Sequence, residues 1–261
     1  MHTIRKEVIA MGRIIAVANQ KGGVGKTTTA INLSSCLSAK GQKVLAIDMD
    51  PQGNTTSGFG VEKNELENTV YELILGECSV EECLIKNVVK NVSIIPSNVN
   101  LAAAEIELIG IEDKEYILQN KISKIRDQFD FIIIDCPPSL NLLTINALTA
   151  ANTVLVPIQC EYYALEGLSQ LVTTVRQVKR LYNPGIEIEG VLLTMYDGRL
   201  NLTLQVVDEV KKYFPEKVFK NVRLSEAPSF GQPVLYFDRS SRGSQAYEAL
   251  TAEILDKNRK G

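Results

Sequence analysis

The chain has 261 residues, a hydrophobic fraction of 45% and a formal net charge of −3. This length and composition suit one large α/β domain, and no apolar stretch approaches the roughly 20 residues of a membrane-spanning helix. The acidic balance disfavours nucleic-acid binding by the whole surface, although a local basic patch can still bind it.

The first residues are predicted to form an N-terminal arm, residues 1–12, ahead of a single domain over 13–261. Charges at Arg5, Lys6 and Glu7 interrupt the arm, which therefore lacks the long apolar core of a signal peptide. Either the arm is disordered or Met11 is the natural start. Five scattered cysteines without a C-x-x-C pair indicate a reduced, cytoplasmic protein.

Short apolar runs alternate with helical patterns along the chain. The runs are nearly continuous, as in strands buried on both faces of a parallel sheet; they cover 14–18, 44–47, 92–95, 131–134, 154–156 and 191–193. Helices are predicted over 28–39, 113–128, 142–150, 167–182, 202–213 and 244–256. The expected fold class is α/β, a doubly wound and mostly parallel sheet with helices on both faces.

A glycine-rich segment follows the first run and reads Asn-Gln-Lys-Gly-Gly-Val-Gly-Lys-Thr-Thr-Thr from Asn19 to Thr29. Strand, glycine-rich loop and helix form the setting of a phosphate-binding loop, because backbone N–H groups and the helix N-terminus attract an anion. We predict that Lys26 reaches the β- and γ-phosphates of ATP and that the Thr27 hydroxyl binds Mg²⁺. The predicted nucleotide contacts are Lys21, Gly22, Gly23, Val24, Gly25, Lys26, Thr27 and Thr28.

Carboxylates follow two of the predicted strands. Asp48 and Asp50 come after the second run, and Asp135 ends the run over 131–134. Because ligands gather at the carboxyl ends of strands in open α/β sheets, these side chains are expected to face the phosphates. Asp135 has the position of a Walker B aspartate near Mg²⁺. The alternative is that all three only cap strands and turns.

The loop departs from the usual pattern, because Gln20 stands in place of the first glycine and Lys21 follows it. Lys-Gly-Gly-Val-Gly-Lys-Thr resembles the deviant Walker A motif of the ParA/MinD/nitrogenase-iron-protein superfamily. The resemblance implies that Lys21 acts in trans on the nucleotide of a dimer partner. A glycine turn with two solvated lysines is the alternative.

Two further segments, 48–54 and 135–139, are similar to switch I and switch II of that superfamily. By this resemblance Asp50 orients the attacking water and belongs with Lys21 and Lys26 to the catalytic group, while Asp48 supports the metal. Segments 142–148, 159–167 and 224–229 resemble the Soj/ParA partitioning ATPases. That family has an Ile-Pro-Arg segment before the residue aligned with Asn221; it is missing here, which leaves Asn221 as the expected adenine contact.

The resemblance implies a function for basic residues of the C-terminal third. Family arginines there bind DNA without sequence preference, and Arg199 and Arg223 match such positions. Without the resemblance, solvated surface charges are the simpler interpretation.

The family resemblance implies a Mg²⁺-dependent ATPase with weak intrinsic activity. With ATP it forms a homodimer, binds nonspecific double-stranded DNA on the nucleoid and segregates chromosomal or plasmid DNA with a ParB/Spo0J-type protein.

Two alternatives belong to other classes. A MinD-like membrane-surface ATPase needs a basic amphipathic C-terminal helix, whereas 247–257 mix acids with few apolar residues. An iron–sulfur carrier of the nitrogenase-iron-protein type needs clustered cysteines, of which only Cys136 is suggestive.

Overall fold

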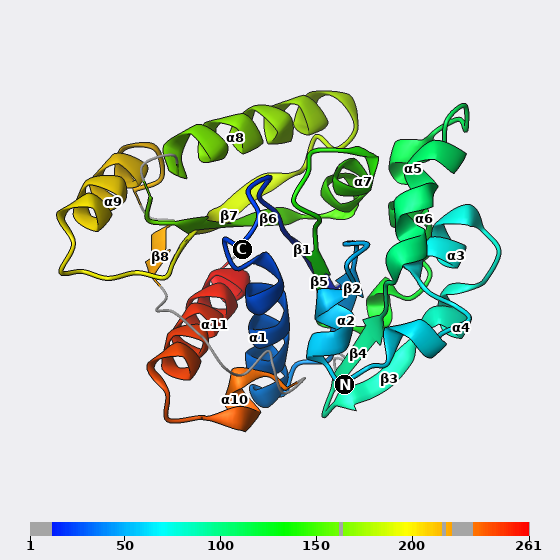
Figure 1. The fold of residues 1–261 in the computed structure, drawn as a ribbon, viewed down its shortest axis with the longest axis horizontal. Helices are drawn as coiled ribbons and strands as arrows, with labels where there is room; N and C mark the ends of the chain where they lie inside the picture. Colours follow the sequence, from blue (N-terminus) through cyan, green and yellow to red (C-terminus); the bar gives the residue numbers. More distant parts are fainter. Residues whose placement is uncertain (1–11, 162–163, 216–217, 221–231, 261) are drawn as a thin grey trace, which may run out of the picture.

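One eight-stranded sheet forms the centre of the molecule (Figure 1). The computed structural model describes residues 12–161, 164–215, 218–220 and 232–260. Within them the strand order is β3-β4-β2-β5-β1-β6-β7-β8, and all neighbours are parallel except β3 and β4. The strands are β1 (Arg13–Val17), β2 (Val44–Asp48), β3 (Ile85–Val89), β4 (Val92–Ile95), β5 (Phe131–Asp135), β6 (Thr153–Gln159), β7 (Glu187–Thr194) and β8 (Val218–Lys220).

Helices cover both faces of the sheet, as predicted for a doubly wound fold (Figure 1). The α-helices are α1 (Lys26–Ala39), α2 (Asn54–Gly58), α3 (Val70–Leu75), α4 (Val80–Cys83), α5 (Ala104–Glu107), α6 (Ile117–Ile122), α7 (Leu142–Ala150), α8 (Ala164–Leu181), α9 (Asn201–Tyr213), α10 (Val234–Phe237) and α11 (Arg242–Lys260). Short 3₁₀ helices are η1 (Lys63–Glu65), η2 (Val99–Ala103), η3 (Lys114–Tyr116) and η4 (Arg126–Gln128). The predicted arm lies almost wholly outside the described residues, and its assignment stays a prediction.

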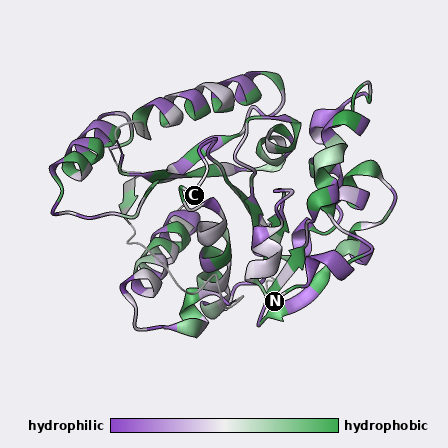
Figure 2. Ribbon diagram, in the orientation of Figure 1, coloured by the Kyte–Doolittle hydropathy of each residue, from purple (hydrophilic) through white to green (hydrophobic). Residues whose placement is uncertain are grey.

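The strands are buried on both faces because successive side chains point to opposite sides. In β1, Ile15 and Val17 belong to the core under α1 and α11, whereas Ile14 and Ala16 belong to the core on the other face. Figure 2 shows hydrophobic residues along the central strands and a mixed pattern along the outer helices. This explains why the sequence shows continuous apolar runs instead of alternation.

The helix predicted over 113–128 is wrong as one continuous element. The structure has η3, the short helix α6 and η4 in its place. The Asn146 side chain of α7 causes the first break: its Oδ1 accepts from the Leu118 N–H at 3.1 Å and its Nδ2 donates to the Lys114 carbonyl at 2.8 Å. These two backbone groups would otherwise bond to each other within a helix.

The C-terminal helix α11 packs against α1. Tyr247, Leu250 and Ile254 of α11 are buried in the core on that face. The apolar side of the helix is therefore used inside the fold, which does not favour the membrane-surface alternative. Among the described helices, none is long and apolar enough to cross a membrane.

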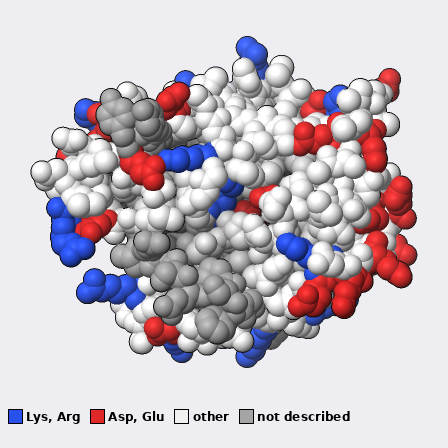
Figure 3. Space-filling view, viewed as in Figure 1, with Lys and Arg blue, Asp and Glu red and all other residues white. Residues whose placement is uncertain are grey.

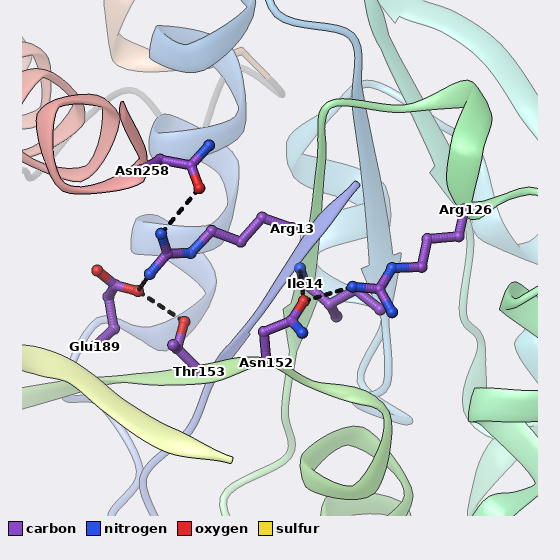
Figure 4. A network of polar contacts seen from close by, with 7 residues as sticks. All are labelled: Arg13, Ile14, Arg126, Asn152, Thr153, Glu189 and Asn258. Atoms are coloured by element: carbon purple, nitrogen blue, oxygen red, sulfur yellow. Dashed lines mark hydrogen bonds and ion pairs between the residues drawn. The ribbon is translucent and has the colours of Figure 1, made fainter. Parts of the chain in front are cut away.

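A polar network ties α11 to the start of the sheet (Figure 4). The guanidinium of Arg13 donates to Glu189 at 2.6 Å and to Asn258 at 3.0 Å. The Thr153 hydroxyl donates to the same Glu189 oxygen at 2.7 Å. Because the Glu189 carboxylate is buried, it depends on these two donors.

We predict that Arg13→Met lowers the free energy of unfolding by about 3 kcal/mol, because it leaves a buried carboxylate without its cation. Urea denaturation monitored by circular dichroism measures the loss. The double variant with Glu189→Gln removes the stranded charge and should recover part of it. An Arg13→Met protein as stable as the wild type would contradict a structural role for this network.

Candidate nucleotide-binding site

The glycine-rich loop joins the end of β1 to the start of α1, as the sequence predicts. Gly25 caps α1 in the left-handed conformation, with φ of 90°, and its carbonyl accepts from the Thr29 N–H at 2.9 Å. A residue with a side chain is strained in this conformation, so glycine is required at the turn into the helix. Gly22 and Gly23 form an exposed tip, whereas Val24 is buried.

Neighbouring strands hold the loop in place. The Asn19 side chain donates to the Pro157 carbonyl of β6 at 2.7 Å and accepts from the Lys21 N–H at 3.0 Å. The Thr194 hydroxyl, at the end of β7, donates to the Val24 carbonyl at 2.8 Å. Asn19 and Thr194 escape the sequence analysis, which looks only for groups that contact phosphate.

Lys26 lies inside this loop. Its side chain is buried and Nζ donates to the Lys21 carbonyl at 3.0 Å. Burial lowers the pKa of Lys26, while the negative charge of Asp135 opposes that shift. A buried ammonium group is costly unless an anion compensates it, so the loop suits a phosphate.

Lys21 points to a different partner. Its ammonium forms an ion pair with Glu161, and both side chains are partly exposed. With Gln20 it lines a surface hollow of about 510 Å³, whose opposite walls are Pro138 to Leu140 and the start of α8. Of the two lysines of the motif, Lys26 is thus buried inside the loop and Lys21 lies at the surface.

Asp135 ends β5 directly beside the loop. Its Oδ2 accepts from the hydroxyls of Thr27 at 2.8 Å and Thr55 at 2.7 Å. Its Oδ1 is buried and has no hydrogen-bond partner among the described residues. A buried, unsatisfied carboxylate oxygen beside a threonine hydroxyl fits the hard oxygen donors that Mg²⁺ requires.

Asp48 lies opposite Asp135 in the register of β2 and β5. Its oxygens accept from the N–H and hydroxyl of Thr56, each at 2.8 Å, and from the Asp50 N–H at 3.2 Å. In this structure Asp48 therefore organises the start of α2, and its role at the metal stays a prediction. Burial raises the pKa of both carboxyls, and in Asp135 the charge of Asp48 adds to the effect.

Asp50 is placed by a buried serine that the sequence analysis misses. Ser97, just after β4, donates from Oγ to the Asp50 carbonyl at 2.8 Å and from N–H to Thr56 Oγ1 at 2.9 Å. Gly53 makes this approach possible, because a Cβ there would lie 2.7 Å from the Ser97 carbonyl oxygen. The sequence signal that could have found Ser97 is a polar residue two positions after a buried strand.

Of the two predicted DNA contacts, Arg199 is among the described residues. Arg199 is highly exposed and forms a two-point ion pair with Asp197, at 2.9 Å and 2.7 Å. Hydrogen bonds from Arg199 lower the pKa of Asp197 to about 2. Arg223 and Asn221 fall outside the described residues, so their roles stay predictions.

The described cysteines do not support the iron–sulfur alternative. Cys136 is fully buried, which raises the pKa of its thiol. No group of three or more His, Cys, Asp or Glu side chains in the described ranges is arranged to hold a metal ion.

Comparisons with known proteins show which family the chain belongs to. A family model described as AAA domain matches residues 12–188. The sporulation initiation inhibitor protein Soj of Bacillus subtilis is 53% identical over 94% of this chain and 98% of that protein. The chromosome partitioning protein ParA of Myxococcus xanthus is 47% identical over 95% of this chain and 89% of that protein. The chain belongs to the ParA/Soj family of chromosome-partitioning ATPases.

Solved structures place this ParA/Soj chain among nucleotide-bound relatives. Cobyrinic acid a,c-diamide synthase from Mycobacterium smegmatis, solved with ADP and magnesium, has a TM-score of 0.83, 36% identity and 94% coverage of both chains. A putative plasmid partition protein from Borrelia burgdorferi, bound to AMPPNP, has a TM-score of 0.80 and 28% identity, with 95% of this chain and 99% of that chain covered.

We predict that Asp135→Asn stabilises the nucleotide-free protein by about 1 kcal/mol near pH 8, while it impairs use of Mg²⁺. Because the pKa of Asp135 is raised in the folded state, the unfolded chain loses this proton first. Stability therefore falls as pH rises above about 4, the ordinary carboxyl range, toward the raised pKa.

Urea midpoints at about pH 5 and about pH 8 measure this effect, and the gap between variant and wild type should widen at the higher pH. Asp127→Asn, which alters an exposed carboxylate, is the matched control and should show no gap. A destabilised Asp135→Asn protein near pH 8 would refute the assigned burial cost.

Proposed function

We propose that this protein is a Mg²⁺-dependent ATP switch that partitions chromosomal or plasmid DNA. It binds ATP, forms a homodimer, holds double-stranded DNA without sequence preference and thereby associates with the nucleoid. Hydrolysis to ADP and phosphate, stimulated by a ParB/Spo0J-type DNA-binding protein, ends the bound state. The observation that carries the proposal is the position of Lys21, Lys26 and the Thr27–Asp135 pair at one edge of the sheet in a ParA/Soj chain.

Each residue of the site has a defined task. The loop from Gly22 to Thr28 surrounds the phosphates with backbone N–H groups, and Lys26 neutralises the β- and γ-phosphates. Thr27 and Asp135, with Asp48 behind them, would hold Mg²⁺, which when bound would neutralise the charge that develops on the phosphates.

Catalysis relies on positioning more than on proton transfer. Asp50 orients the attacking water, and its backbone is fixed by Ser97 at 2.8 Å. The sole histidine of the chain, His2, lies outside the described residues, and no histidine stands in the site motifs. A site without a strong general base is suited to slow turnover that a partner accelerates.

The two lysines should separate binding from dimerisation. We predict that Lys26→Ala loses ATP affinity by about 2–5 kcal/mol, because it removes a buried charge-assisted contact. Lys21→Ala should leave ATP binding to the monomer nearly intact and weaken ATP-dependent dimerisation. The comparison is matched, because Lys26 bonds to the backbone carbonyl of Lys21 and not to its side chain.

Equilibrium dialysis measures ATP binding, and light scattering measures the dimer. Equal loss of monomer ATP binding in both variants would rule out a trans role for Lys21. Near-normal ATP affinity of Lys26→Ala would refute the phosphate-loop assignment itself.

DNA binding should depend on ATP and on Arg199. Co-sedimentation with duplex DNA in the presence of ATP, ADP or no nucleotide tests the proposal directly, and only ATP should support strong binding. Arg199→Ala should weaken binding to all sequences alike and reduce the slope of log affinity against log salt by about one per lost contact.

A substitution of Asp197, the carboxylate that pairs with Arg199, should have the opposite effect on DNA affinity. Asp197→Asn keeps the shape of the side chain but removes the charge that pairs with Arg199, so DNA affinity should increase. DNA binding that is equally strong without ATP, or that prefers one short sequence, would refute the proposed ATP-dependent switch.

A further inference from the structure

Four aliphatic side chains between β4 and α6 are exposed. Val99, Ile106, Ile109 and Ile111 have 72%, 73%, 73% and 50% of their surface accessible. They belong to η2, to α5 and to the turn after it, and we call them the α5 surface. Exposed apolar groups that lie together on a surface are typical of interaction sites.

The segment that carries this surface is firmly packed from beneath. Leu101, Ala104 and Leu108 alternate with the exposed residues and are at most 2% accessible, as members of the main core. The exposed isoleucines are thus presented outward by a segment whose other side is fixed. Their exposure is therefore not a result of local unfolding or poor packing.

Three acidic side chains flank the exposed aliphatic residues along the chain and form an acidic rim. Glu107, Glu112 and Asp113 are exposed within the same segment. Figure 3 shows Asp and Glu gathered along the right-hand side of this face, where Figure 1 places α3 to α6. Lys and Arg lie mainly over the centre and left of the same view.

Charge complementarity decides what fits such a surface. Two copies of this chain meeting symmetrically here would set acidic rims against each other, which is unfavourable. We propose that the α5 surface binds a basic, amphipathic segment of the DNA-binding partner, with aliphatic side chains for the isoleucines and Lys or Arg for the rim. This inference rests on the proposed function, because it assigns a docking surface to that partner.

The α5 surface is connected to both switch segments. Its segment starts next to Ser97, which bonds to the backbone of Asp50. Farther along, Glu105 accepts from the Asn141 side chain, which caps α7 through the Thr144 N–H at 3.3 Å. Thr144 in turn donates to the Ser139 carbonyl of switch II at 2.7 Å. Docking at this surface thus acts on groups that position the reacting water and phosphate.

The test uses the double variant Ile106→Ser/Ile109→Ser in the full chain. The probe is the purified ParB-type protein of the same genome, together with overlapping peptides that tile its sequence. We expect partner binding to weaken at least about tenfold and stimulation of ATP hydrolysis to disappear. Basal hydrolysis, ATP-dependent dimerisation and DNA binding should remain at wild-type levels.

Two further variants sharpen the result. Leu181→Ser alters another exposed aliphatic residue, which lies at the end of α8 and is 55% accessible, and this variant should behave as wild type. Glu112→Lys reverses one charge of the rim and should weaken the basic peptide without affecting basal hydrolysis.

Unchanged partner binding by the double variant overturns the proposal. So does loss of ATP-dependent dimerisation without the partner, since the surface would then be a contact between copies. If the wild-type chain neither binds the ParB-type protein nor is stimulated by it, the proposed function fails together with this inference. If the wild type responds and the double variant responds equally, only the inference fails.

Discussion

The ammonium group of Lys26 and the carboxylates of Asp48 and Asp135 are withdrawn from water at one edge of the sheet. Each must be compensated there: the carboxylates mainly by hydroxyl groups of Thr27, Thr55 and Thr56, and Lys26 by the Lys21 carbonyl and the charge of Asp135. These short side chains belong to α1 and α2, so both helix starts are fixed by the same buried charges. The order of the loops around the site therefore follows from an electrostatic requirement.

The elements that the sequence predicts are those with a strong local signal. Continuous apolar runs identify the central strands, and the glycine-rich loop identifies the site, because left-handed glycines and a following lysine have few other uses together. β3 lacks such a signal, since Lys86 and Asn87 interrupt its apolar residues and it is only partly buried at the edge. The helices α3 and α4 carry a signal that the sequence analysis missed: Thr69 with Glu72 and Ser79 with Glu82 form capping boxes.

Long-range contacts account for what could not be predicted. Asn146 replaces a helical hydrogen bond in a segment far along the chain, and no pattern within 113–128 indicates it. Ser97 and Thr194 serve the site only because separate strands end beside it. The partner of Lys21 was equally invisible, since Glu161 comes close only in the fold. The Arg199–Asp197 pair is local, and no pattern in the sequence singles out Asp197. Both ion pairs are solvent-accessible and contribute little stability, so Lys21 and Arg199 can leave their carboxylate partners for a more strongly charged anion.

The central position of β1 has a consequence for how the chain is made. β1 is the first strand to be synthesised, yet its neighbours in the sheet are β5 and β6, and Arg13 meets Glu189 and Asn258 (Figure 4). The strand that leads into the glycine-rich loop must therefore wait unpaired while most of the chain leaves the ribosome. Non-local pairing of this kind folds slowly and leaves apolar strands exposed to association. Nascent chains of this protein should accordingly expose an apolar strand until β5 and β6 have been released.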